Sequence, residues 1–203
     1  MKFNPLVTAV FVALNLSAAC VMAQESAWQS SYQLEPVGRY AEAIAALDKV
    51  PANSADAELK ALRRGWLLCL SGKFDESIRE YRQAIERNAK SVDARLGLTL
   101  ALLTAKRWRD AEQSAHAALE LSPNNYIALL RLTIALEAQR DWPAMLKSAN
   151  NLVTSYPSDA AAYVYLARAN AWLGKPDQAV VAYNAVLSRY PGQLEANAYL
   201  NKK

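Results

Sequence analysis

A leucine returns every 34 residues along this chain, and that period constrains the fold more than any other feature of the sequence. The four positions are Leu34, Leu68, Leu102 and Leu136. Three residues before each of them, and again before Asn170, stands a small residue: Ser31, Gly65, Thr99, Thr133 and Ala167. A fixed period of this length indicates an array of similar repeats, each too small to bury its apolar side without its neighbours.

Two further columns with the same period mark a turn inside each repeat. Glycine stands in the first column at Gly38, Gly72 and Gly174, and Lys106 and Arg140 fill the two intermediate places. Glycine adopts the left-handed conformation that ends a helix at little energetic cost. Two residues later comes an aromatic residue in four repeats and Pro176 in the fifth; the aromatic residues are Tyr40, Phe74, Trp108 and Trp142. The two columns together predict a helix, a turn, and a second helix packed through its aromatic residue.

Prolines and apolar spacing complete the pattern. Pro123, Pro157 and Pro191 close the last three repeats, where they would end one helix before the next begins. Between these marks, apolar residues recur at helical spacing, and no useful length of chain alternates with a period of two. The sequence therefore predicts helices and no sheet.

This combination of period and columns resembles the tetratricopeptide repeat, a helix–turn–helix unit of 34 residues. The resemblance implies an all-α, right-handed α–α superhelix, or solenoid, of about five repeats over residues 24–203. The repeats would span residues 24–55, 56–91, 92–125, 126–159 and 160–193, with a closing helix at 194–203. Three positions depart from the family pattern: Met145 replaces a small residue, Arg64 an apolar one, and Pro36 interrupts the first helix, expected from Ala27 to Glu35.

Residues 1–23 are predicted to be a signal peptide that is removed. Lys2 precedes an apolar run at 6–14, and Val21-Met22-Ala23 suits a signal peptidase. In the alternative, Ser17-Ala18-Ala19-Cys20 resembles a lipoprotein box, with Cys20 acylated. Both routes predict an exported protein, and no segment of the mature chain has a transmembrane composition. Cleavage after Ala23 would leave Cys69 alone, predicted to be buried and inert.

The composition argues against catalysis. The chain has two cysteines and one histidine, His116, too few for the common thiolate or imidazole metal centres. It contains no glycine-rich phosphate loop, no G-x-S-x-G elbow and no H-E-x-x-H motif. We therefore expect no enzyme, no cofactor and no metal, and we expect His116 on the surface. The net charge of +4 comes with only a weak basic patch, so nucleic acid is not an expected partner.

Proteins of the family that this chain resembles bind partners in a concave groove lined by the first helices. By register, the groove residues would be Leu59, Leu62, Trp66, Leu96, Leu100, Ile127, Leu130, Ile134, Val164, Arg168 and Trp172. Because this set is almost wholly apolar, we expect an apolar peptide or amphipathic helix as ligand, with Arg168 meeting a carboxylate of the partner. In the alternative, several of these leucines pack between adjacent first helices.

The resulting hypothesis is a non-enzymatic interaction scaffold or adaptor in the bacterial cell envelope, located in the periplasm. It would bind a peptide or helix of another envelope protein. The alternative is a lipid-anchored outer-membrane assembly factor of pilus or secretion type, which needs Cys20, and an enzyme is a remote third reading. The sequence leaves open the partner, the pathway, the oligomeric state and whether the concave or the convex face binds.

Overall fold

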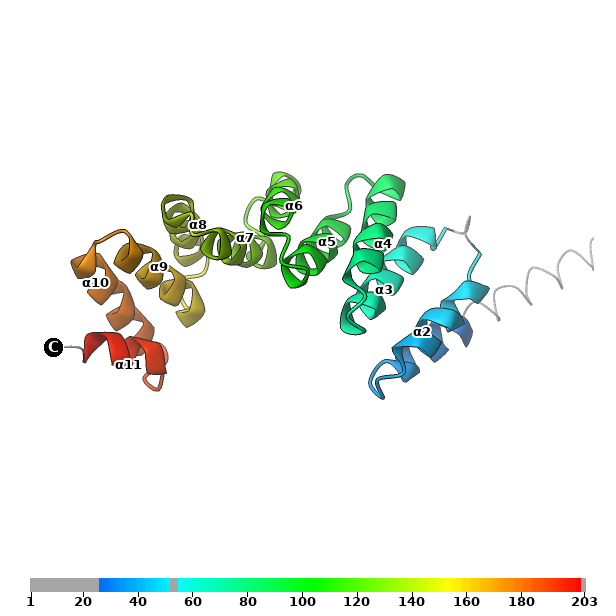
Figure 1. The fold of residues 1–203 in the computed structure, drawn as a ribbon, viewed down its shortest axis with the longest axis horizontal. Coiled ribbons are helices and arrows are strands. Elements are labelled where there is room, and N and C mark those ends of the chain that lie inside the picture. Colours follow the sequence, from blue (N-terminus) through cyan, green and yellow to red (C-terminus); the bar gives the residue numbers. More distant parts are fainter. Residues whose placement is uncertain (1–25, 52–54, 202–203) are drawn as a thin grey trace, which may run out of the picture. The chain divides into compact units, whose positions relative to one another are not determined.

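The computed structural model describes residues 26–51 and 55–201, and every regular element in these ranges is a helix (Figure 1). The chain divides into two compact units, an N-terminal unit that ends at Ala89 and a C-terminal unit that begins at Lys90. The all-helical prediction is confirmed. The predicted signal peptide and Cys20 lie outside the described residues.

The helices alternate between the first and the second helix of each repeat. The N-terminal unit contains a helix over residues 26–34, α2 (Tyr40–Ala46), the 3-10 helix η1 (Leu47–Lys49), α3 (Ala57–Leu70) and α4 (Phe74–Arg87). The C-terminal unit contains α5 (Val92–Thr104), α6 (Trp108–Leu121), α7 (Tyr126–Gln139), α8 (Trp142–Ser155), α9 (Ala160–Trp172), α10 (Pro176–Leu187) and α11 (Leu194–Leu200). The predicted aromatic column, with Pro176, supplies the first residue of every second helix.

A further 34-residue column explains where the first helices of the C-terminal unit begin. Side-chain oxygens at the N-cap accept a hydrogen bond from a backbone N–H of the first turn in each case. The caps are Ser91, Asn125, Asp159 and Gln193. The prolines that close the repeats each lie two residues before one of these caps, so chain reversal and helix initiation are encoded together.

The turn between the two helices of a repeat has the same geometry five times. The residue in the glycine column has a positive φ in every repeat, and this includes Lys106 at 58° and Arg140 at 60°. The next residue donates its N–H to the carbonyl of the residue in the leucine column, as Arg107 does to Leu102 at 2.8 Å and Asp141 to Leu136 at 3.0 Å. This is a Schellman-type helix end. The leucine column therefore marks the carbonyl that closes the first helix.

The small-residue column lies where the two helices of a repeat approach most closely. A Cβ atom on Gly65 would lie 3.0 Å from the Tyr81 ring, and the Ser77 hydroxyl donates to the Gly65 carbonyl at 2.7 Å. In the C-terminal unit, Thr133 pairs with Ser148 at 2.7 Å between α7 and α8. The column therefore provides close packing and satisfies buried hydroxyl groups.

The departures from the family pattern are accommodated locally. Met145 is fully buried in a core cluster that includes Leu132 and Leu136, so the larger side chain fills space there. Arg64 bridges Asp48 and Glu80, each at 2.8 Å.

The N-terminal helix ends in a turn over residues 35–38, which contains Pro36. Cys69 is half-buried, not fully buried as expected, because its helix α3 turns this position partly toward solvent. No helix in the described ranges has the length and apolar character that a bilayer span requires.

Candidate partner-binding face

The first helices of the C-terminal unit expose two large apolar side chains of the predicted set. Trp172, at the end of α9, is 66% exposed, and Ile127, at the start of α7, is 42% exposed. Leu100, Leu130 and Ile134 are half-buried. These five residues retain surface that a partner could cover, and burying apolar surface favours association.

Leu96 and Val164 lie in the core and leave the candidate face. Leu96 packs in a cluster with Ala118 and Ala128, and Val164 packs with Ala167 and Ala182. Ala118, Ala128 and Ala182 are small residues on neighbouring helices, so these helices can pack closely over Leu96 and Val164. For these two residues the structure agrees with the alternative reading, in which apolar side chains of the first helices pack between helices.

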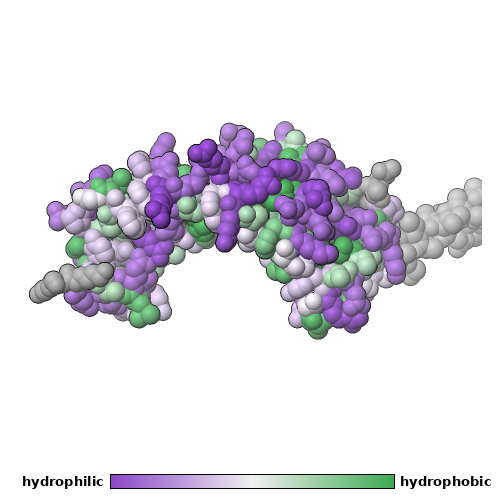
Figure 2. Space-filling model, viewed as in Figure 1, coloured by the Kyte–Doolittle hydropathy of each residue, from purple (hydrophilic) through white to green (hydrophobic). Residues whose placement is uncertain are grey.

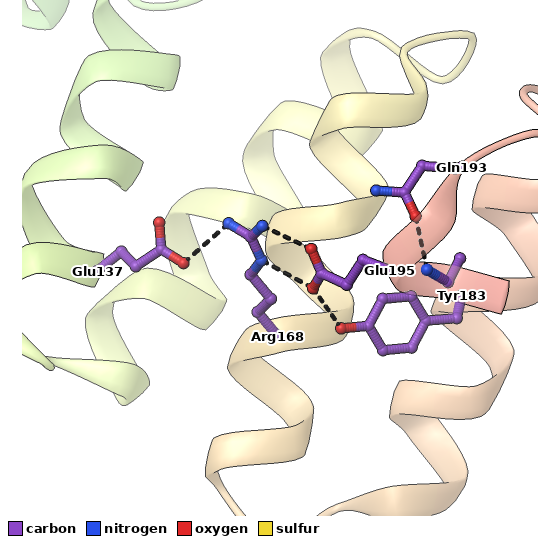
Figure 3. A network of polar contacts seen from close by, with 6 residues as sticks. Glu137, Arg168, Tyr183, Gln193 and Glu195 are labelled. Atoms are coloured by element: carbon purple, nitrogen blue, oxygen red, sulfur yellow. Dashed lines mark hydrogen bonds and ion pairs between the residues drawn. The ribbon is translucent and has the colours of Figure 1, made fainter. Parts of the chain in front are cut away.

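Arg168 binds two carboxylates of its own chain (Figure 3). Its Nε and Nη2 donate to Glu195 Oε1 and Oε2 at 2.8 and 2.6 Å, a bidentate pair, and its Nη1 donates to Glu137 Oε1 at 3.1 Å. The Tyr183 hydroxyl donates to Glu195 Oε1 at 2.7 Å. We call Glu137, Arg168, Tyr183 and Glu195 the Arg168 network; it joins α7, α9, α10 and α11.

The Arg168 network shifts the pKa values of Glu195 and Tyr183 in opposite directions. The hydrogen bonds from Arg168 lower the pKa of Glu195, against a smaller opposing effect of burial. Burial raises the pKa of Tyr183, and its hydrogen bond to Glu195 raises it further. Glu195 therefore stays ionised and Tyr183 stays protonated around neutral pH. The sequence predicts that Arg168 meets a carboxylate of a partner. In the structure, Arg168 binds two carboxylates of its own chain.

A cavity of about 500 Å³ adjoins the Arg168 network. Its lining consists of Glu137, Arg168, Ala171, Trp172, Tyr183, Glu195, Ala198 and Tyr199. Trp172 is held there by stacking on Trp142, with ring centroids 5.1 Å apart and planes 6° from parallel. The cavity thus combines aromatic walls with charged groups, a common composition for a binding pocket.

The N-terminal unit contains a related cluster. The Trp66 Nε1 donates to Glu35 Oε1 at 2.7 Å, and the Arg63 guanidinium pairs with Glu35 Oε2 and donates to the Ser31 carbonyl. Burial opposes ionisation of Glu35, but the bonds from Trp66 and Arg63 lower its pKa overall. Trp66 retains 36% exposure, and Leu59 and Leu62 retain part of their surface. Both oxygens of Glu35 are engaged.

Sequence reasoning missed Glu137, Glu195, Tyr183 and Trp142. A signal existed for Glu137, because Glu35 and Glu137 occupy the same position of repeats that are three periods apart. Trp66 and Arg168 share a position in the same way. No comparable signal marks Glu195, because its role depends on how α11 packs against α9.

A second cavity lies on the second-helix side of the C-terminal unit, with a volume of about 610 Å³. Leu129, Leu132 and Leu136 of α7 contribute to its lining, together with His116 and Lys147. His116 is exposed, as expected.

In the view of Figure 2, hydrophilic side chains cover most of the surface over α6 and α8, with small separate apolar patches. Within the described ranges, no three His, Cys, Asp or Glu side chains are placed to hold a metal ion.

Comparisons with known proteins agree with this architecture. Two family models, each described as a tetratricopeptide repeat, match residues 62–126 and 161–192. None of the curated proteins compared with the chain matches it.

The chain is similar to several solved structures. MamA from Desulfovibrio magneticus RS-1 has a TM-score of 0.76 at 14% identity, over 85% of this chain and 97% of that chain. MamA from AMB-1 has a TM-score of 0.71 at 18% identity, over 92% and 100%. YrrB, described as a TPR protein with an unusual peptide-binding site, has a TM-score of 0.71 at 17% identity, over 83% and 87%. At these identities the similarity establishes the fold.

Proposed function

We propose that this chain, a tetratricopeptide repeat protein, is a non-enzymatic scaffold that binds a peptide or amphipathic helix of another protein. The ligand would lie on the first-helix face of the C-terminal unit, which we define by Leu100, Ile127, Leu130, Ile134, Arg168 and Trp172. The observation that carries this proposal is Trp172, which is two-thirds exposed, is stacked on Trp142 and lines a cavity. Fixed, exposed tryptophans are frequent anchors of protein interfaces. The peptide-binding site named for YrrB supports the same class of ligand.

The chemistry of the face supports binding over catalysis. A general acid or base needs a pKa near the working pH. In the Arg168 network, however, the pKa of Glu195 is lowered and that of Tyr183 is raised. Both shifts move the groups away from proton exchange at neutral pH. The network is therefore suited to hold α9 and α11 in place under a ligand.

A peptide library displayed on phage and selected on the purified full chain tests this function. Affinities of the selected peptides would be measured by fluorescence anisotropy for the parent, for Trp172→Ala and for the control Val181→Ala. Val181 is 70% exposed on α10, a second helix, so the control removes apolar surface elsewhere. We expect loss of affinity for Trp172→Ala alone. Loss for Val181→Ala alone would place binding on the second-helix side, and selection of no peptide would contradict the function.

We further propose that the protein acts in the bacterial cell envelope, exported to the periplasm, with another envelope protein as partner. The composition of residues 1–23 supports this location. Mass spectrometry of the mature N-terminus distinguishes the two routes. A start at Gln24 supports the soluble periplasmic form, an acylated Cys20 supports the outer-membrane lipoprotein, and an intact Met1 in the envelope-free fraction contradicts both.

A further inference from the structure

The cavity beside Trp172 has an excess of negative charge. Glu137 and Glu195 face a single guanidinium, so the three groups carry a net charge of −1. Arg168 already donates to both carboxylates, and its charge is therefore compensated within the network. An acidic side chain entering this cavity would meet one cation and two anions. Electrostatics disfavour an acidic ligand here.

Glu137, which lines the cavity, has one carboxylate oxygen that the Arg168 network does not use. Its Oε1 accepts from Arg168, whereas Oε2 has no hydrogen-bond partner among the described residues. In Figure 3, the second carboxylate oxygen of Glu137 carries no dashed line. A purely apolar side chain that filled the cavity would remove water from this oxygen and offer no hydrogen bond in return, which is costly.

The aromatic wall of the cavity suits a cation. Trp172 turns one ring face to Trp142 and remains 66% exposed. An ammonium or guanidinium group over an indole face is attracted by the electrons of the ring. A lysine or arginine stem can also cover the apolar part of the ring while its charged end reaches a carboxylate. An exposed indole and an open carboxylate oxygen thus line one cavity.

We propose that this cavity takes a lysine or arginine side chain of the bound partner, with the cation between Glu137 Oε2 and the Trp172 ring. This inference rests on the proposed function, because it names the chemistry of the ligand at the same face. It reverses the expectation from sequence: the side chain next to Arg168 is basic, because Arg168 is already neutralised by its own chain.

The direct test uses NMR on the ¹⁵N-labelled full chain, following the indole N–H signal of Trp172, assigned with Trp172→Phe. The probes are the Nα-acetyl amides of lysine, norleucine and glutamate, which vary the charge on comparable stems. We expect the lysine amide to shift the signal and to bind roughly threefold to fivefold more tightly than the norleucine amide. Equal or tighter binding of the norleucine or glutamate amide would overturn the proposal.

Two matched variants locate the cation. Glu137→Gln keeps an acceptor for Arg168 and removes the negative charge, and we expect it to weaken lysine amide binding roughly twofold to fivefold. Glu120→Gln removes an equivalent charge from an exposed position on α6 and should leave the binding unchanged. Unchanged binding by Glu137→Gln, with an unchanged melting temperature, would overturn the placement.

Selected peptides separate this inference from the proposed function. Replacing each basic residue of a selected peptide with norleucine should weaken binding to the parent and have less effect on Glu137→Gln. Peptides that bind equally well without basic residues would contradict the cation pocket and leave the scaffold function standing. If the lysine amide binds at Trp172 but the chain selects no peptide, the cation pocket stands and the scaffold function is contradicted.

Discussion

Glu35 in the N-terminal unit and Glu137 in the C-terminal unit occupy the same position of repeats three periods apart, yet their surroundings differ. Glu35 accepts from Trp66 through one oxygen and from Arg63 through the other. Glu137 lines a cavity and accepts from Arg168 through one oxygen, and its other oxygen has no hydrogen-bond partner among the described residues. The first carboxylate is closed and the second is available to a ligand.

The arginines that bind these two carboxylates, Arg63 and Arg168, differ in exposure. The Arg63 side chain is 6% exposed and lies over the Tyr32 ring, whereas Arg168 is 34% exposed and lines the cavity. Arg63 and Arg168 come from different positions of the repeat, whereas the carboxylates that they bind, Glu35 and Glu137, share one position. The same repeat position thus has different neighbours in the two units.

The largest predicted difference is between the two arginines. Arg63→Leu should destabilise the protein by about 2–3 kcal/mol, because the Arg63 side chain is only 6% exposed and its bonds to Glu35 and to the Ser31 carbonyl are shielded from solvent. Arg168→Leu should cost about 1 kcal/mol or less, because solvent reaches both of its partners. Urea unfolding followed by circular dichroism measures both. Equal costs would contradict the contrast between a closed and an open carboxylate.

The small-residue column offers a second comparison, between Gly65 and Ala167. Leucine at either position should destabilise by roughly 1–3 kcal/mol, because it forces two closely packed helices apart. Gly65→Ala should also be destabilising, since the added Cβ meets the Tyr81 ring at 3.0 Å, whereas alanine is native at 167. Thermal melts of the three variants test this. Unchanged midpoints for both leucine variants would show that the repeat register is wrong.

Substitutions in the turn column should change the free energy of unfolding in opposite directions. Lys106 and Arg140 hold a left-handed conformation that costs a non-glycine residue about 1 kcal/mol, so Lys106→Gly and Arg140→Gly should each stabilise by about that amount. Gly72→Ala and Gly174→Ala should each destabilise similarly. Chemical denaturation distinguishes the two pairs. Destabilisation by all four variants would mean that the lysine and arginine make contacts that outweigh the backbone strain.

The smallest effect concerns pH. The folded pKa of Glu195 is lowered from its ordinary value of 4.5, mainly by Arg168. Its stabilising contribution is thus fully present above pH 4.5 and is lost as the pH falls through the folded value. Glu195→Gln should lower the urea midpoint at pH 7 and match the parent in strong acid. A difference between the two chains that persisted unchanged into strong acid would contradict this linkage.

The fold was predictable because each column of the repeat reports local physics. The turn column needs a left-handed residue, the leucine column marks the carbonyl that closes a helix, and the small column marks close packing. These requirements act within a few residues or one helix pair, so they are visible as a period. Lys106 and Arg140 show the limit of this reasoning, because their backbone conformation follows the repeat and not their own preference.

The candidate face was less predictable, because exposure depends on which side chains meet across helices. Leu96 and Leu130 share a column, but Leu96 is buried against Ala118 and Ala128 while Leu130 is half-buried. The sequence predicted that Arg168 meets a carboxylate of a partner, and in the structure it binds Glu137 and Glu195 of its own chain. Glu195, which pairs with Arg168, lies on α11. The repeat pattern does not predict how α11 packs near α9.

The most direct test compares the two tryptophans, using the selected peptide that binds most tightly. Trp172→Ala should weaken peptide binding about tenfold or more, because an exposed anchor is lost, and the loss of its stack on Trp142 should lower the melting temperature by only a few degrees. Trp66→Ala should leave the affinity unchanged and lower the melting temperature, because Glu35 loses the indole N–H. Full affinity in a well-folded Trp172→Ala, with loss of affinity in Trp66→Ala, would contradict binding by the C-terminal unit.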